Sequence, residues 1–171
     1  MPATIARMQA PRDTTASGYF GAMAASYDDF IRRGVPCYDL MSDRLVDYLP
    51  PTATRVLELG CGTGNLSLRL AARYPGAHLT LVDASAEMVA TTRDRLAAAN
   101  PDAHLTFTTC LFEQLDLQPA SFDLITSALS LHHVIAKAAL YAGLARALAP
   151  GGTFRFSDQL RGSGRNHDHN W

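Results

Sequence analysis

The spacing of apolar positions divides the chain into two parts. From Tyr19 to Ile31, apolar side chains recur at intervals of three and four residues, which predicts one face of a helix. Gly34 and Pro36 then end that helix. A second helical pattern runs up to Pro50-Pro51, with these apolar side chains on one face: Tyr38, Met41, Leu45 and Tyr48. Residues 1–17 show no period and are expected to form a mobile tail.

From residue 54 onward, short apolar runs alternate with helical patterns. The predicted strands are 54–59, 78–83, 104–109, 122–128 and 152–157, and the helices between them are 65–73, 85–98 and 134–148. This alternation predicts an α/β fold, a parallel sheet with helices on both faces. A ligand crevice is expected where the carboxyl ends of the strands meet.

The first predicted strand runs directly into a loop with glycine at every second position, Glu58-Leu-Gly-Cys-Gly-Thr-Gly64. Without a Cβ, these glycines allow positive φ and close approach of a ligand to backbone amides. A dinucleotide fingerprint beginning at Gly60 needs glycine where Asn65 stands, which weakens that interpretation. A phosphate-binding P-loop is excluded, because it needs a Gly-Lys pair and the chain's single lysine is Lys137.

Three landmarks then occur in a fixed order. Glu58–Gly64, followed by Asp83 at the end of the second strand, resembles the first motif of class I S-adenosylmethionine-dependent methyltransferases. Phe122–His133 looks like the fourth strand and following loop of that family, and Leu148–Gly152 like the turn before its fifth strand. The resemblance implies a Rossmann-like sheet, S-adenosyl-L-methionine as cofactor, and a transferase that carries out methylation.

The resemblance also places the cofactor. Asp83 lies where the family has its ribose-binding carboxylate, and the glycine backbone would meet the methionine portion. The full set expected to bind the cofactor is Tyr27, Arg33, Tyr38, Glu58, Gly60, Cys61, Gly62, Gly64, Asn65, Asp83, Ala84, Met88, Cys110, Leu111, Phe112 and Ser127.

Recognition of adenine departs from the pattern. Many relatives carry an aspartate where this chain has Leu111, so another group must accept from the adenine amine. Glu113 or the backbone at Cys110 and Leu111 are the alternatives. Leu111 and Phe112 either pack against the adenine ring or belong to the core.

The segment from Tyr27 to Tyr38 resembles the lid of small-molecule methyltransferases, and also that of carboxy-S-adenosylmethionine synthase. By this resemblance Tyr27, Arg33 and Tyr38 would face the cofactor, since arginine binds carboxylates and a tyrosine ring attracts a sulfonium. The alternative is that both tyrosines only fill the contact between helix and sheet.

Two histidines follow the fourth strand and are candidates for a general base. Either imidazole could act as a base near neutral pH, and His132 is the preferred candidate. The alternative is that they cap the next helix or line the pocket. Asp158 is a weaker candidate and is expected to be a surface carboxylate.

The resemblance also defines the expected domain organisation: a tail at 1–17, a helical lid at 18–50, a cofactor-binding core at 51–158 and coil at 159–171. The sixth and seventh strands of the family are apparently missing. The fifth strand would then be an exposed edge, covered in a homodimer or by a partner, unless the gene product is truncated or frameshifted. His167 and His169 lack a third ligand, so no metal site is expected.

Composition favours a compact enzyme, with 47% hydrophobic and 18% charged residues. A net charge of −1 argues against nucleic-acid binding, and we expect neither a membrane span nor a secretory leader, because the sequence shows no long apolar run and no basic segment followed by an apolar one. Its three cysteines, Cys37, Cys61 and Cys110, have no metal-ligand spacing and leave an odd count, for which a reducing cytoplasm is the simplest setting. We therefore expect methyl transfer to a small-molecule oxygen, nitrogen or carbon nucleophile. The alternatives are a carboxy-S-adenosylmethionine synthase-like or tRNA-modification enzyme, and a non-catalytic fragment or partner subunit.

Overall fold

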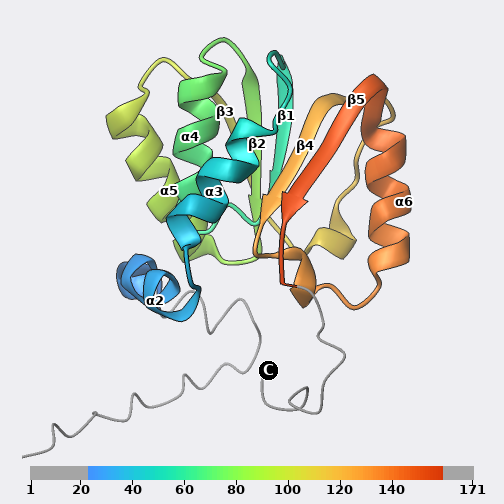
Figure 1. The fold of residues 1–171 in the computed structure, drawn as a ribbon. Coiled ribbons are helices and arrows are strands. Elements are labelled where there is room, and N and C mark those ends of the chain that lie inside the picture. Colours follow the sequence, from blue (N-terminus) through green and yellow to red (C-terminus); the bar gives the residue numbers. More distant parts are fainter. Residues whose placement is uncertain (1–22, 160–171) are drawn as a thin grey trace, which may run out of the picture.

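Five parallel strands form one sheet in the computed structural model, which describes residues 23–159 (Figure 1). The strand order is β3-β2-β1-β4-β5, and every neighbouring pair is parallel. The strands are β1 (Arg55–Leu59), β2 (His78–Asp83), β3 (His104–Thr109), β4 (Phe122–Ala128) and β5 (Leu148–Ser157). This arrangement confirms the predicted Rossmann-like α/β sheet. Each short strand is followed by a helix, and a helix between two neighbouring strands connects them in parallel.

Helices cover both faces of this sheet, as the pattern predicts. One buried cluster joins the sheet to α3 (Tyr38–Asp47), α4 (Asn65–Arg73) and α5 (Ala86–Ala99). A second cluster joins the opposite face to α6 (Lys137–Ala147). Neighbouring residues of β1 divide between the clusters, with Val56 in the first and Leu57 in the second, and both are fully buried.

The helical segment before the sheet differs in part from its pattern. A 3-10 turn, η1 (Ala24–Ser26), precedes α2 (Tyr27–Gly34), which Figure 1 shows beside the lower ends of the strands. Met23, Ile31, Tyr38 and Leu45 are buried as expected. Tyr48 is 67% exposed because α3 ends at Asp47, so its prediction as part of the apolar face is wrong.

Two predicted boundaries moved near the site. The last helix begins at Lys137 rather than 134, because a 3-10 turn, η3 (Leu131–His133), comes first. The fifth strand begins at Leu148, four residues earlier than predicted, since it pairs with Phe122 before a shift in register. The expected tail at 1–17 and the residues after 159, including His167 and His169, lie outside the described residues.

Candidate functional site

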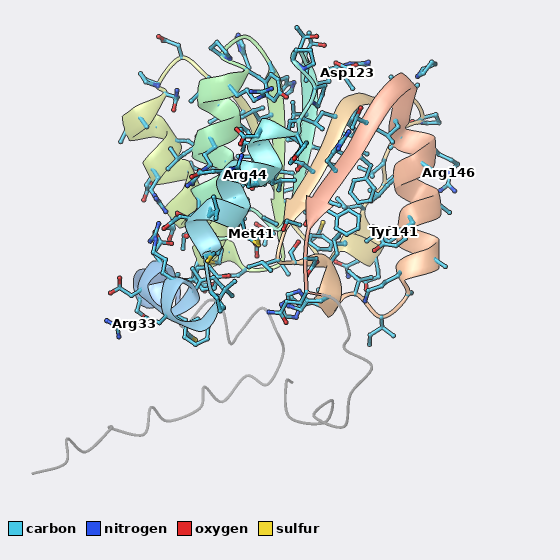
Figure 2. The ribbon with its side chains drawn as sticks, in the orientation of Figure 1. Arg33, Met41, Arg44, Asp123, Tyr141 and Arg146 are labelled. Carbon is cyan, nitrogen blue, oxygen red and sulfur yellow. The ribbon has the colours of Figure 1, made fainter. Side chains whose placement is uncertain are left out.

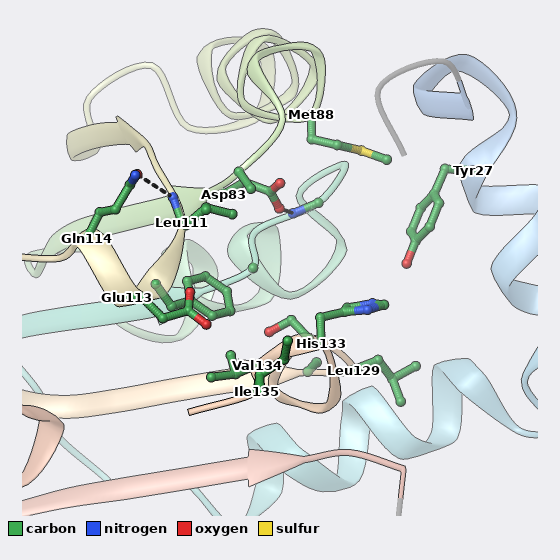
Figure 3. A pocket seen from close by; sticks show the side chains of 16 residues that line it. Tyr27, Asp83, Met88, Leu111, Glu113, Gln114, Leu129, His133, Val134 and Ile135 are labelled. Atoms are coloured by element: carbon green, nitrogen blue, oxygen red, sulfur yellow. Dashed lines mark hydrogen bonds between the residues drawn. The ribbon is translucent and has the colours of Figure 1, made fainter. Parts of the chain in front are cut away.

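A cavity of about 520 Å³ opens at the carboxyl ends of the strands, where the fold places its ligand crevice (Figure 3). The segments after β1, β2, β3 and β4 all contribute to it, together with α2. Its lining consists of Tyr27, Gly60, Gly62, Asp83, Ala84, Met88, Leu111, Phe112, Glu113, Gln114, Ala128, Leu129, Ser130, His133, Val134 and Ile135.

The glycine-rich loop forms one wall because its backbone turns with positive φ. Gly60 has a φ of 77°, and a Cβ there would overlap the side chain of Ser130. Ser130 lies that close because its hydroxyl donates to the carbonyl of Leu59, at 2.9 Å, and lies 2.6 Å from the hydroxyl of Ser127. The loop after β4 is thus bonded to the end of β1, and only glycine fits between them.

Asp83 is fixed at the end of β2 by backbone amides. Its two carboxylate oxygens accept from the amides of Gly62 and Ser85, each at 2.9 Å. Burial raises the pKa of Asp83, and these amide hydrogen bonds oppose the rise. A carboxylate offers about four acceptor positions, so two remain for a ligand's paired hydroxyls.

The turn after β3 forms the opposite wall. Leu111 precedes the 3-10 turn η2 (Phe112–Gln114), and its amide donates to the side-chain carbonyl of Gln114 at 3.3 Å. Leu111 is 50% exposed and lines the cavity, so it is not a core residue. Phe112 lines the cavity and also packs against the buried cluster beneath it, so its contact with an adenine ring stays a prediction. Glu113 also lines the cavity.

Tyr27 reaches into the cavity from α2. Figure 3 shows its hydroxyl end pointing toward the imidazole of His133, while Met88 lies on the opposite side of the cavity from that imidazole. Burial raises the pKa of the Tyr27 hydroxyl, and the charges of Tyr38, Asp83 and Asp28 raise it further. The hydroxyl is therefore neutral at physiological pH.

A polar cluster holds α2 against the glycine-rich loop. The side chain of Asp28 accepts from the Thr63 hydroxyl at 2.5 Å and from the Asn65 amide at 2.9 Å. Arg95 of α5 lies 3.2 Å from the same carboxylate and donates to the Thr63 carbonyl at 2.7 Å. Burial alone would raise the pKa of Asp28, but these hydrogen bonds and the charges of Arg95 and Arg32 hold it below its usual value.

His132, His133 and Asp158 form a connected group at the end of the sheet. The His132 Nδ1 lies 2.6 Å from the Asp158 Oδ1, and the His132 amide donates to Oδ2 at 3.1 Å. The rings of His132 and His133 lie 4.0 Å apart between centroids, and His133 faces the cavity. The side chain of Asp158 is only 5% exposed, so its prediction as a surface carboxylate is wrong.

This group keeps His133 neutral. Loss of water around the ring, together with repulsion from His132, lowers the pKa of His133 to about 4, although Asp158 acts in the opposite direction. Burial raises the pKa of Asp158, but the hydrogen bond from His132 and backbone amides bring it below its usual value. At pH 7 the cavity therefore holds a neutral imidazole with an ionised carboxylate behind it.

The structure gathers half of the predicted cofactor residues around the cavity. Those that line it are Tyr27, Gly60, Gly62, Asp83, Ala84, Met88, Leu111 and Phe112. Those outside the lining are Arg33, Tyr38, Glu58, Cys61, Gly64, Asn65, Cys110 and Ser127. His132, the preferred base, also lies outside it, one residue behind His133.

Most of the predicted cofactor residues that do not line the cavity support the structure around it. Gly64 caps α4, Ser127 supports Ser130, and Glu58 is buried beneath the loop. Asn65 and Tyr38 extend the cluster around Asp28. Arg33 is exposed and Figure 2 shows it pointing away from the body of the molecule, so its position gives no support to a role in binding.

Sequence reasoning missed several residues of this site. Ser130, Leu129 and Gln114 line the cavity, and Asp28 and Arg95 hold its wall. Gly60 signals that some group approaches closely, but the sequence does not say that Ser130 is that group. Leu129 has a φ of 53°, a strained conformation for leucine that periodicity does not reveal.

Two kinds of feature are absent from residues 23–159, the part of the chain that the structure describes. Within that range, histidine, cysteine, aspartate and glutamate form no cluster of three or more that could hold a metal ion. No helix in the same range has the length and apolar character needed to cross a membrane.

Comparison with known proteins agrees with the site. The profile of the methyltransferase domain family matches residues 56–152. A trans-aconitate 2-methyltransferase from Mycolicibacterium gilvum is 45% identical over 74 residues, covering 43% of this chain and 27% of that protein. A ubiquinone biosynthesis O-methyltransferase from Idiomarina loihiensis is 38% identical over 104 residues, covering 60% of this chain and 41% of that protein. This chain thus spans less than half the length of these curated relatives.

A solved structure has a similar fold. The S-adenosylmethionine-dependent methyltransferase from Mesorhizobium loti superposes with a TM-score of 0.59 and is 35% identical. The match covers 67% of this chain and 50% of that one.

Proposed function

The chain belongs to the methyltransferase domain family, whose cofactor is S-adenosyl-L-methionine, and from this premise we propose that its cavity binds that cofactor and transfers the methyl group to a small-molecule nucleophile. When bound, the cofactor supplies an activated methyl on a sulfonium. The protein then has to hold the two reactants in line and exclude water.

The observation that carries the proposal is that Asp83 and His133 face one cavity. Asp83 and the amides of the glycine-rich loop fit a ribose and an amino-acid group. His133, on the other side, is neutral and able to accept a proton or a hydrogen bond from an incoming hydroxyl or amine. Tyr27 lines the same cavity, and its aromatic ring would attract a sulfonium cation.

Charges behind His133 suit this role. The ionised Asp158 raises the pKa of His133, in opposition to burial and to His132, so its charge would stabilise a proton taken up on the imidazole. His133 is therefore proposed as the group that touches the acceptor, whereas His132 and Asp158 position it. This reverses the order in which the two histidines are ranked from sequence.

A small-molecule acceptor is supported by the relatives, which include enzymes named for trans-aconitate and for ubiquinone biosynthesis. The carboxy-S-adenosylmethionine alternative needs an arginine at the cofactor, and Arg33 lies outside the lining. The non-catalytic alternative predicts cofactor binding without turnover.

We also propose that the outer edge of β5 is covered by a second copy of the chain. Within residues 23–159, β5 ends the sheet, and Phe156 on it is 45% exposed. A long apolar edge favours pairing with another strand, and a twofold axis would satisfy both copies at once. Light scattering on the purified chain tests this, since a monomer at micromolar concentration would contradict it.

The test of the main proposal is calorimetric titration with S-adenosylmethionine and S-adenosylhomocysteine. We expect micromolar binding of both, and Asp83→Ala should weaken binding by about 1–3 kcal/mol through loss of hydroxyl hydrogen bonds. Asp102→Ala, at an exposed turn outside the lining, is the matched control and should bind normally. Failure of the folded chain to bind either compound would contradict the proposal.

A further inference from the structure

A hydroxyl group stands on the buried, otherwise apolar face of α5. Met88, Val89 and Leu96 of this helix are buried, and Thr92 between them is 0% exposed. A buried hydroxyl has lost its contacts with water, so it lowers stability unless the protein supplies a hydrogen-bond partner. Valine is branched in the same way and would fill this position without that cost. The contacts of the Thr92 hydroxyl therefore show what it does there.

The Thr92 hydroxyl holds the glycine-rich loop. It donates to the carbonyl of Gly62 at 2.7 Å, and it is also a hydrogen-bond partner of the Cys61 thiol. The carbonyl of the next residue, Thr63, accepts from Arg95, about one turn further along α5, at 2.7 Å. Two consecutive carbonyls of the loop are thus held by side chains from one face of one helix.

The same glycine is bonded at its other end to Asp83. The Gly62 amide donates to the Asp83 Oδ2 at 2.9 Å, and Figure 3 marks this hydrogen bond beside Asp83. Gly62 has a φ of 52°, and a residue without a Cβ passes readily into other backbone conformations. Its amide stays directed at Asp83 only while both ends of the residue are held. Thr92 holds the carbonyl end, and so it also limits the rotation of the amide.

From these contacts we propose that Thr92 is a positioning residue for ribose recognition, whose hydroxyl acts through Gly62 to keep the Asp83 carboxylate turned toward the ribose hydroxyls of the cofactor. The inference rests on the proposed function and deepens it. The other oxygen of Asp83 accepts from the Ser85 amide, so loss of the Gly62 contact lets the carboxylate turn without releasing it. Hydrogen bonds are directional, and a turned carboxylate meets the two hydroxyls poorly.

Two ligands that differ only in the ribose hydroxyls test this. They are S-adenosylhomocysteine and its 2′,3′-dideoxy analogue, titrated calorimetrically into the full chain. We expect the original chain to bind S-adenosylhomocysteine about tenfold or more tightly than the analogue, because hydroxyl contacts with a carboxylate are missing in the analogue. Thr92→Val should weaken binding of S-adenosylhomocysteine about 5- to 10-fold and change binding of the analogue by less than about twofold. A purely structural role would not favour one ligand over the other.

Matched variants show whether the hydroxyl is responsible. Thr92→Ser keeps the hydroxyl and should bind S-adenosylhomocysteine within about twofold of the original chain. Thr91→Val makes the same substitution where the hydroxyl donates to the Glu87 carbonyl of its own helix, so it should change neither affinity. Thermal unfolding shows that each titrated chain is folded. Thr92→Ala removes the same hydroxyl and replaces Thr92→Val in every comparison if the valine variant does not fold.

A double variant tests the route through Asp83. In Asp83→Ala the contact with the ribose is already absent, so adding Thr92→Val should change the affinity for S-adenosylhomocysteine by less than about twofold. Losses that add in the double variant would show that Thr92 acts elsewhere, and would overturn the inference.

Three other results would also overturn it. They are equal weakening of both ligands by Thr92→Val, equal effects of Thr92→Val and Thr91→Val, and an analogue that binds the original chain as tightly as S-adenosylhomocysteine does. In each of these cases S-adenosylhomocysteine still binds the original chain, and the proposed function stands. Failure of the original chain to bind S-adenosylhomocysteine would instead overturn the proposed function and, with it, the role of Thr92.

Discussion

The His132 Nδ1 lies 2.6 Å from the Asp158 Oδ1, which joins the turn after β4 to the residue that follows β5. The pair is largely removed from water, with side-chain exposures of 13% and 5%. Because His133 packs its ring against His132, the carboxylate fixes one imidazole directly and the next one indirectly. A residue at the end of the outermost described strand thus helps to orient a group inside the cavity.

Replacing Asp158 by asparagine should therefore slow turnover without affecting cofactor binding. A general base contributes about 10²–10⁴ to rate, and loss of its orientation should leave a kcat about 10- to 100-fold lower than that of the original chain. The dissociation constant for S-adenosylhomocysteine should stay within about twofold. Both are read from steady-state kinetics and calorimetry.

Asp123→Asn is the control for that variant. Asp123 also accepts hydrogen bonds, from Thr54 and Arg55, but at the opposite end of the sheet. Its replacement should lower thermal stability and leave the kcat of the folded chain unchanged. Equal losses of kcat in the two variants would show that Asp158 acts only through stability.

Much of the fold was predictable because its signals are local. The alternation of β1 to β5 with α4, α5 and α6 follows from apolar period, and β2 was predicted with its observed bounds. The predicted ends of helices and strands were wrong where contacts distant in sequence determine them. Leu148 extends β5 because Phe122 is available to pair with it, and no local pattern shows that partner.

Only those residues of the site whose position follows from a strand end were predictable from the sequence. Gly60, Gly62 and Asp83 stand at strand ends and were identified from spacing, whereas the choice between His132 and His133 depends on which ring a short turn directs into the cavity. The contacts of Asp28 with Thr63 and Arg95 join residues 35 and 67 positions apart, so no sequence period could reveal them.

The contacts of Asp28 predict that this residue holds α2 against the glycine-rich loop. Asp28→Asn removes the charge that faces Arg95 and should loosen α2, which carries Tyr27. We expect cofactor affinity about 3- to 10-fold weaker, together with faster hydrogen exchange confined to α2, because partly exposed ion pairs contribute about 1 kcal/mol. Asp29→Asn, at an exposed position on the same helix turn, should change neither. Unaltered exchange in Asp28→Asn would mean that α2 is held by its apolar contacts alone.

Gly60 should not tolerate a side chain. Gly60→Ala combines a φ of 77° with overlap against Ser130, and it should destabilise the chain by about 2–4 kcal/mol in denaturant unfolding. Adding Ser130→Gly should recover only the part due to overlap, leaving about 1 kcal/mol from the backbone conformation. Gly76→Ala, where a Cβ meets no atom within 4 Å, should change stability by less than about 0.5 kcal/mol. Full recovery in the double variant would contradict the contribution assigned to φ.

The burial of the Glu58 carboxyl predicts an unusual dependence of stability on pH. It is 1% exposed beneath the loop, and its Oε2 accepts from the Ser67 hydroxyl at 2.6 Å. The pKa of Glu58 is raised to about 8, chiefly by burial and also by the charge of Asp83, while the Ser67 hydrogen bond opposes the rise. In the unfolded chain the same carboxyl ionises near 4.5. Between these two pH values the folded chain therefore holds one more proton than the unfolded chain.

The free energy of unfolding should consequently fall as pH rises from about 5 to 8, by an amount of up to about 4 kcal/mol from this group. Glu58→Gln keeps a neutral hydrogen-bonding side chain of similar shape and cannot ionise, so its stability relative to the original chain should rise steadily over that range. Glu87→Gln, on the exposed first turn of α5, should show no such rise. The measurement is urea unfolding at pH 5, 6, 7 and 8 for all three chains. If the Glu58→Gln and original curves run parallel, Glu58 ionises in the folded chain as it does in the unfolded one, and the loop rests on a charged carboxylate.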